Sequence, residues 1–270
     1  MQGSSRAAAL AGRTALRTAL ESGTDQTTLA EDLFGITAAI DDNAALRRAL
    51  ADPSREGAAK ADLVGRLFDG KVSPVAVELL KTLASQRWAT ERDLADTVES
   101  LAVETAIARA EEAGRADQVE DELFRFERIV AGNVGLREVL TDRRGDVHGK
   151  DEVVSRLLQG KASGETIRLV RQAVLAPRGR RFDRVLEAYL AIAATRRKQL
   201  AATVTTAVDL DATQRERLVT ALATHYGTAV HLNVVLDPAV LGGIRVQIGD
   251  DVVDGTILRR LDTAKRHFGA

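Results

Sequence analysis

Hydrophobic positions recur every three or four residues from the N-terminus to about residue 197, which is the spacing of one face of an α-helix. In the first such stretch, Ala8, Ala11, Ala15 and Leu16 follow this spacing. A pattern of this kind predicts amphipathic helices that bury their apolar side. The first half of the chain is expected to form helices over residues 4–21, 25–40, 43–50, 54–68, 74–86 and 90–113.

Capping residues and glycines mark the ends of these helices. Ser73 precedes Pro74; a serine accepts a hydrogen bond from the first helical turn, and proline at the first helical position loses none. We expect Ser54 to cap the fourth helix, and either Thr24 or Asp25 to cap the second. Glycines that end helices are expected at Gly23, Gly70 and Gly114.

The chain repeats itself with an offset of about 90 residues. Asn43 aligns with Asn133, and Gly70 aligns with Gly160, so cap and turn residues recur together with the apolar positions. Chance similarity between two alanine- and leucine-rich segments is the alternative, but it does not account for the matching caps and turns. We therefore expect two tandem copies of one helical-bundle module, over residues 1–110 and 111–197.

After Lys198 the pattern changes to the alternation and β-branched composition typical of strands. Two short alternating runs flank Gly249-Asp250, which predicts a hairpin. The expected fold is thus mainly α, with a small C-terminal α+β domain of four strands and two helices over residues 198–270. Its strands are expected near 201–209, 230–236, 244–248 and 252–253, and its helices over 211–226 and 254–268.

Composition and charge exclude several classes of function. The net charge is −1, so no overall field attracts nucleic acid or an anionic membrane. The chain has no cysteine, which excludes disulfides and thiolate metal sites. No apolar run reaches the length of about 18 residues that a membrane span requires. These features predict a cytosolic protein, or one that reaches a membrane only through its partners.

No motif predicts catalysis, a cofactor or a metal. The segment from Gly65 to Lys71 has the spacing of a phosphate-binding loop, but no strand precedes it, and glycine that ends a helix is the preferred interpretation. None of the four histidines is paired at helical spacing, and no GxSxG motif is present. Trp88 is expected to anchor packing. The arginines at 178, 180 and 181 could contact phosphate, with Tyr189 as a residue that stacks on a base, but a solvated helix face is preferred.

Apolar helix faces remain as the candidate sites. Small alanines on residues 4–21 would let another helix approach closely, and Val75, Leu79 and Leu83 would line the floor of a groove for an amphipathic partner helix. Packing within the module's own core is the alternative for most of these residues.

The C-terminal sequence carries a resemblance to a known family. GGIRVQIGDDVVDGTILRRL, residues 242–261, resembles the C-terminal signature of the delta subunit of F-type ATP synthases, related to the mitochondrial oligomycin-sensitivity-conferring protein. Residues 111–270 are similar to one member of ordinary length, so the first module is an extra copy. GRADQVEDELFRFERI resembles the enlarged actinobacterial type, which is sometimes fused to a stalk subunit; here we expect a free subunit.

The resemblance implies a non-catalytic stator subunit, present as one copy in a hetero-oligomer at the cytoplasmic face of the plasma membrane. It would hold the N-terminal helices of the alpha subunits in a groove between the first and fifth helices of a module, and the C-termini of the b or b′ peripheral stalk with its last domain. The alternatives are a helical-repeat adaptor for an unrelated helix, and an enzyme that uses Asp250, Asp251 and Asp254, for which turn and capping roles are simpler. The implied partner-binding residues are Ala8, Ala11, Ala15, Leu79 and Leu83 in the first module, Ile167, Val170 and Val174 in the second, and Ile257, Leu258 and Leu261 in the last domain.

Overall fold

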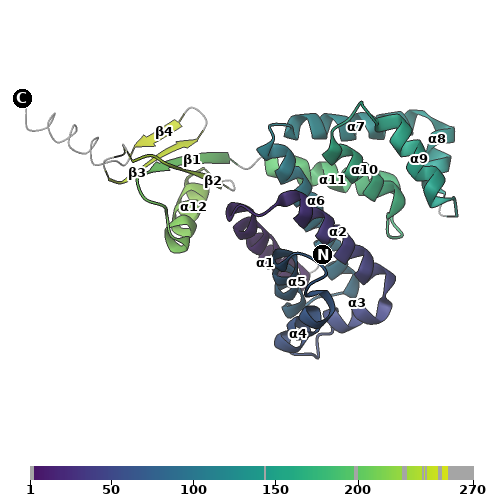
Figure 1. The fold of residues 1–270 in the computed structure, drawn as a ribbon, viewed down its shortest axis with the longest axis horizontal. Helices are drawn as coiled ribbons and strands as arrows, with labels where there is room; N and C mark the ends of the chain where they lie inside the picture. Colours follow the sequence, from purple (N-terminus) through teal and green to yellow (C-terminus); the bar gives the residue numbers. More distant parts are fainter. Residues whose placement is uncertain are drawn as a thin grey trace, which may run out of the picture. The chain divides into compact units, whose positions relative to one another are not determined.

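The computed structural model describes residues 3–142, 144–197, 200–226, 230–238, 240, 242–248 and 251–254. The chain forms two compact units, residues 1–193 and residues 194–270 (Figure 1). The first unit is built from helices, and the second contains the sheet. The predicted fold class is therefore confirmed: the protein is mainly α, with a small α+β part at the C-terminal end.

The helical unit contains two series of helices in the order that the repeat predicts. The first series is α1 (Gly3–Glu21), α2 (Gln26–Asp42), α3 (Ala44–Ala51), α4 (Gly57–Phe68), α5 (Pro74–Ser85) and α6 (Glu91–Glu112). The second series is α7 (Ala116–Gly132), α8 (Val134–Thr141), α9 (Val147–Leu158), α10 (Gly164–Leu175) and α11 (Phe182–Arg197).

Two helices, α2 and α5, begin at their predicted caps, and other helices begin at caps of the same kind. Asp25 accepts from the amide of Thr27, Asn43 caps α3, and Ser73 caps α5 ahead of its first-turn proline. The second copy repeats two of these caps, at Asn133 for α8 and at Ser163 for α10. The match supports the repeat at the level of local hydrogen bonding, because a cap fixes where a helix begins.

The predicted cap at Ser54 is wrong. Helix α4 begins at Gly57, and its N-cap residue, Glu56, makes no side-chain capping bond. The amide and the hydroxyl of Ser54 both donate to Asp52, which forms a local turn instead. A Cβ on Gly57 would stand 2.9 Å from the carbonyl oxygen of Ser85, so the first residue of α4 lies close to the end of α5.

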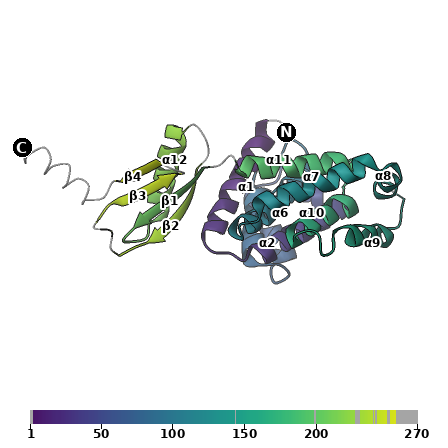
Figure 2. The same cartoon turned by 90° about the horizontal axis from the view of Figure 1, so that it is seen from above.

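Helix α6 is the centre of the helical unit. It packs against α1, α2, α3 and α5 of the first series and against α7 and α10 of the second (Figures 1 and 2). Almost every position between Leu94 and Ala110 is buried, which is typical of a helix enclosed on all sides. Shifted by the repeat offset, α1 aligns with α6, so α6 is both the last helix of one copy and the first helix of the next.

This sharing bears on the expected module boundary after residue 110. The boundary falls in the last turn of α6, and the contact pattern groups α1–α11 into one compact unit. The division into modules 1–110 and 111–197 stays a prediction about the repeat.

A carboxylate ties α2 to α5 in the first copy, and another ties the equivalent helices, α7 and α10, in the second. In the first copy, Asp32 of α2 accepts from the backbone amide of Ser73 at 2.8 Å. In the second copy, Glu122 of α7 accepts from the amide and hydroxyl of Ser163 and from the hydroxyl of Thr166. Burial alone would raise the pKa of Glu122, but the bonds from Thr166 and Ser163 outweigh it and lower the pKa.

Arg178, in the loop between α10 and α11, is buried among acidic side chains. Its guanidinium contacts the carboxylates of Asp41 on α2 at 3.2 Å, and Asp96 and Glu99 on α6 at 2.8 Å each. Burial alone would lower its pKa, but Glu99 and then Asp96 and Asp41 raise it, and the net shift is upward. The residue also has a left-handed backbone with φ of 53°, a conformation that costs about 1 kcal/mol outside glycine.

Glu99 is the acceptor at the centre of this network. Its side chain is 2% exposed and accepts from Arg178, from Arg180, and from the phenol of buried Tyr189 at 2.7 Å. Burial, and then the charge of Glu99, raise the pKa of Tyr189 well above its ordinary value of 10.0. The predicted solvated helix face is therefore wrong for Arg178 and Arg180; of that stretch only Arg181 is exposed.

The second unit has a mixed sheet with the strand order β2-β1-β3-β4. Strand β1 pairs in parallel with β2, and β3 is antiparallel to both β1 and β4. Helix α12 forms the crossover between the parallel strands, and Leu222 on it joins the core formed by Ala202, Val204, Val230 and Leu232. The elements are β1 (Leu200–Thr206), α12 (Ala212–Tyr226), β2 (Val230–Leu236), β3 (Ile244–Ile248) and β4 (Asp251–Asp254); the predicted last helix lies outside the described residues.

Replacement of Glu99 by glutamine tests the buried network. The substitution leaves the Arg178 charge buried without its main counter-charge, so we expect the free energy of unfolding to fall by about 3 kcal/mol. Urea unfolding followed by the fluorescence of Trp88 measures this, because Trp88 is the single tryptophan of the chain and is buried in the helical unit. Arg184→Ala, which breaks the exposed ion pair with Glu187, is the control and should leave the unfolding midpoint unchanged. Equal shifts in the two variants would contradict the role of the network.

Glu122→Gln tests the carboxylate tie between α7 and α10. Because the folded pKa of Glu122 lies below its ordinary value of 4.5, its stabilisation is present above that value and is lost as the pH falls through the lowered folded pKa. We expect the variant to be about 1 kcal/mol less stable near neutral pH and equal to the unchanged protein in strong acid. Urea midpoints over a pH series measure the difference. Glu152→Gln, on exposed α9, should show no such pH-dependent gap; a gap that persists in strong acid would refute the titration of Glu122 as its cause.

Candidate functional site

The predicted partner groove lies between α1 and α5, which pack directly on each other. The structure brings Ala8, Leu79 and Leu83 together in the buried core, with 1%, 3% and 0% of their surface exposed. Ala11 and Ala15 are half-buried beside them. The first three residues therefore serve the module's own packing, and the two alanines are the predicted residues that keep some access to solvent.

Gly12 explains how closely α1 approaches its neighbours, and the sequence analysis missed it. A Cβ at this position would lie 2.5 Å from Cδ2 of Leu83 and 3.3 Å from Cδ1 of Leu101. A side chain at this position would therefore require the fully buried Leu83 side chain to move, and glycine lets α1 approach α5 and α6 closely. Part of the small-residue face of α1 therefore packs against helices of the same unit. Its glycine was the signal that could have revealed this contact.

On the two helices of the α1–α5 contact, some side chains are half-buried instead of fully buried. Ala11 and Ala15 contribute from α1, and Val75 and Thr82 contribute from α5. Glu78 stands next to them on α5 with 71% of its side chain exposed, and its hydrogen bond to Lys81 raises the pKa of that lysine. The surface is therefore a shallow apolar strip with a carboxylate at its border.

The repeat offset locates the equivalent groove of the second copy, between α6 and α10. Ala11 and Ala15 correspond to Leu101 and Thr105, which are fully buried. Thr82 corresponds to Gln172, which is 7% exposed. These three positions, which keep access to solvent in the first copy, are therefore buried in the second, whereas Val75 corresponds to half-buried Glu165.

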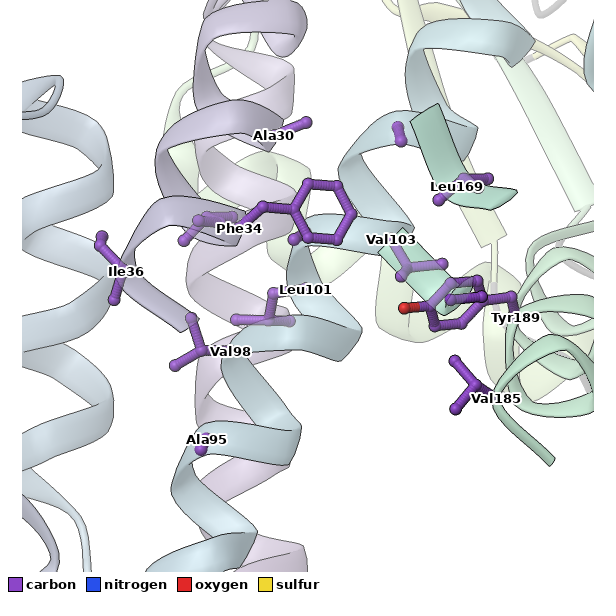
Figure 3. Packing of buried hydrophobic residues seen from close by; sticks show 14 of the residues in the cluster. Ala30, Phe34, Ile36, Ala95, Val98, Leu101, Val103, Leu169, Val185 and Tyr189 are labelled. Carbon is purple, nitrogen blue, oxygen red and sulfur yellow. The ribbon is translucent and has the colours of Figure 1, made fainter. Parts of the chain in front are cut away.

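Helix α2 of the first copy covers this second groove. Phe34 of α2 is 2% exposed and lies in the same stretch of core as Leu101 of α6 and Leu169 of α10 (Figure 3). The guanidinium carbon of Arg168 on α10 stands 4.1 Å from the centre of the Phe34 ring, and the same side chain pairs with Glu31 at 2.6 Å. A cation on an aromatic face together with an ion pair holds α2 to α10.

The predicted residues of the second module have mixed positions. Val170 and Val174 are buried, and Ile167 is half-buried. By the exact offset, the equivalents of Leu79 and Leu83 are Leu169 and Ala173, both buried as well. The second module therefore offers no open counterpart of the α1–α5 edge in the part of the chain that the structure describes. The three predicted residues of the last domain, Ile257, Leu258 and Leu261, lie outside the described residues.

The other candidate motifs resolve into structural roles. Gly65 is buried inside α4, and Gly70 has a φ of 74° at the end of that helix, so the preferred interpretation of the phosphate-loop spacing is confirmed. Trp88 is buried and its indole donates to the carbonyl of Leu83, as a packing anchor does. Tyr189 is buried against Glu99 and cannot stack on a base.

Neither a metal site nor a membrane-spanning helix is found among the described residues. No group of three or more histidine, cysteine, aspartate or glutamate side chains is placed to hold a metal ion among the residues that the structure describes. Within the same residues, no helix combines the length and the apolar character that crossing a bilayer needs.

Comparison with known proteins gives the family. A family model described as "ATP synthase delta (OSCP) subunit" matches residues 13–106 and again residues 103–268, and the two matches meet within α6. The ATP synthase subunit delta of Kineococcus radiotolerans is 48% identical over 246 residues, which cover 91% of this chain and 89% of that protein. The ATP synthase subunit delta of Streptomyces avermitilis is 46% identical over 269 residues, covering 99% of this chain and 98% of that protein. The subunit of the same name in Nocardia farcinica is 42% identical and covers 99% of this chain and 100% of its own length. The chain belongs to the ATP synthase delta (OSCP) subunit family.

Proposed function

We propose that this protein is a stator subunit of a proton-driven rotary ATP synthase. In this role it is present as one copy, joins the alpha/beta catalytic hexamer to the b-subunit stalk, and carries no active site of its own. The observation that carries the proposal is the difference between the two copies at the equivalent helix pairs, α1–α5 and α6–α10. Helix α2 of the same chain contacts the second pair through Phe34 and Glu31, whereas Ala11, Ala15 and Thr82 of the first pair keep some access to solvent.

A stator needs firm contacts at both ends, because it resists the torque of the rotor without turning over a substrate. Nanomolar binding corresponds to about −12 kcal/mol, and a standard interface buries about 800 Å² on each partner. Two helical copies that share α6 supply a larger surface than one copy. Because α6 is enclosed by helices of both copies, they also form a stiff body that can transmit force.

The alpha subunit's N-terminal helix is the occupant that we propose for the α1–α5 edge. It would lie along Ala11, Ala15, Val75 and Thr82, in the place that α2 takes on the second copy. Glu78 stands where the second copy has Arg168, which pairs with Glu31 of α2. The bound helix should therefore present a basic side chain at the position where α2 presents an acidic one.

The stalk contact is assigned to the C-terminal unit. A sheet of this size with one described helix has a small core, and domains of about 70 residues gain stability from a partner. The apolar residues Ile257, Leu258 and Leu261 are the proposed contacts with the C-termini of the b or b′ stalk. The subunit would then sit at the cytoplasmic face of the plasma membrane, held there by the complex.

Ala11→Arg tests the alpha-binding groove. A long charged side chain at the groove edge should obstruct a docked helix, so we expect the affinity for a peptide of the alpha subunit's N-terminal helix to fall at least about tenfold. Isothermal titration calorimetry with the full chain measures this binding. Glu78→Arg, at a well-exposed position, should also weaken binding by reversing the charge at the border.

Ala45→Arg, on the exposed face of α3, is the matched control and should bind the peptide as the unchanged chain does. Trp88 fluorescence checks that each variant is folded. If the full chain does not bind the peptide, or if Ala45→Arg weakens binding as much as Ala11→Arg, the groove assignment fails. Binding of unrelated amphipathic helices with equal affinity would favour a general adaptor instead.

Replacement of Ile257, Leu258 and Leu261 together by aspartate tests the stalk contact. Charged residues cannot be buried in an apolar interface, so we expect at least a tenfold loss of affinity for a peptide of the b subunit's C-terminal end, about 1.4 kcal/mol or more. The affinity for the alpha-subunit peptide should not change. Loss of both activities would indicate a folding defect, and loss of neither would refute the stalk assignment.

A further inference from the structure

The exposed large hydrophobic residues of the helical unit are concentrated in its second copy. Apart from Leu10, those that the structure describes there are Phe124, Ile129, Val134, Val139 and Val147, on α7, α8 and α9. At the equivalent positions the first copy has a buried phenylalanine, three alanines and a glycine: Phe34, Ala39, Ala44, Ala49 and Gly57. Phe124 and Ile129 are five residues apart and lie on different flanks of α7, so the exposed face at Phe124 is distinct from the one at Ile129.

Phe124 has a counterpart in the first copy, Phe34, whose ring is covered by another helix of the protein. It corresponds by the repeat to Phe34, and it is 51% exposed, whereas Phe34 is 2% exposed. Phe34 is covered because Arg168 of α10 lies over its ring and pairs with Glu31, three residues before it. Asp121 occupies the same position relative to Phe124.

The acidic surroundings of Phe124 match a basic partner. Asp121 precedes it by three residues and Glu127 follows it by three, so both lie on its side of α7. Arg128, four residues after Phe124, is the basic residue on that side. Asp121 pairs with Arg125 at 2.5 Å, but both side chains are more than half exposed, and an exposed pair of this kind exchanges partners at little cost. An aromatic ring flanked by carboxylates is a site for a guanidinium or ammonium group.

We propose that the face of α7 formed by Asp121, Phe124 and Glu127 docks an arginine-bearing amphipathic helix of another protein. The incoming helix takes the place on α7 that α10 takes on α2. Its arginine covers the Phe124 ring and pairs with Asp121, as Arg168 covers Phe34 and pairs with Glu31. This surface is separate from the α1–α5 edge, and the proposal does not depend on the alpha-subunit assignment.

A second copy of this chain does not fit the same place. In a head-to-tail repeat of the internal contact, α5 would take the place of α10, and Glu78 would stand where Arg168 stands. Glu78 would then face Asp121, and like charges at a contact oppose association. The occupant is therefore a basic helix of a different protein.

The test uses a helix-stabilised, fluorescent peptide with the α10 sequence GETIRLVRQAVL, because α10 is the helix that covers the equivalent face inside the protein. Fluorescence anisotropy with the full chain measures its affinity. We expect saturable binding that weakens about tenfold in Phe124→Ala, since the aromatic contact and its apolar area are lost. Ile129→Ala, on the other flank of α7 and 54% exposed, is the matched control and should leave the affinity unchanged.

Charge reversal distinguishes a specific contact from non-specific binding of the peptide. A peptide with glutamate in place of Arg168 should bind the unchanged chain at least about tenfold more weakly, and Asp121→Arg should restore its binding. Trp88 fluorescence verifies folding, and Ala11→Arg should bind the α10 peptide normally, which keeps this test independent of the alpha groove. The proposal is overturned if no saturable binding is seen, if the charge-reversed peptide binds equally well, or if Ile129→Ala weakens binding as Phe124→Ala does. Sedimentation that shows self-association through Phe124 would overturn it in favour of a second copy.

Discussion

The buried carboxylate of Glu99 sets a constraint that the rest of the helical unit satisfies. A charge enclosed in the middle of α6 is strongly unfavourable unless counter-charges and hydrogen bonds reach it. All of its described donors come from the second copy: Arg178 and Arg180 from the loop before α11, and Tyr189 from α11 itself. The loop places Arg178 beside Glu99 with a left-handed backbone at that residue. One charge on the shared helix therefore fixes how the second series of helices closes on the first.

That closure has a consequence for binding, because a duplicated module brings two grooves. The second copy's groove sits against the first copy, and α2 fills it with Phe34 and an ion pair to Arg168. The side of this contact that α6 provides is larger than its α1 counterpart at one position, with Leu101 in place of Ala11. Under the proposed function, the duplication turns the α6–α10 contact into an internal interface and leaves the equivalent α1–α5 contact for a partner, as in repeat proteins whose terminal units differ from the inner ones.

Local signals explain how much of this the sequence could predict. Caps such as Asn43 and Ser73 act within a few residues, so helix starts and the repeat were predictable. Ser54 failed as a cap because its amide and hydroxyl donate to Asp52 in a local turn. The role of Arg178 depends on acidic residues far away in the chain, and a run of arginines gives no sign of them. Some of the predicted groove residues are buried and others are half-buried, which the sequence could not distinguish, because an apolar residue can face either the core or a partner. Leu83 faces the core, where α1 approaches it closely at Gly12.

Comparison of the two copies also indicates which charge a partner helix would need at the α1–α5 contact and at the Phe124 face of α7. Where the internal interface has Arg168 against Glu31, the free α5 edge presents Glu78 and the free face of α7 presents Asp121. Both ends are therefore acidic at the same point of the contact, while the internal contact is complementary. This arrangement discourages the chain from adding further copies of itself, since like charges would meet. The same charges favour basic helices from other proteins at both surfaces. Under both proposals, the charge of one side chain distinguishes the internal contact, where Arg168 meets Glu31, from the partner surfaces, where Glu78 and Asp121 stand.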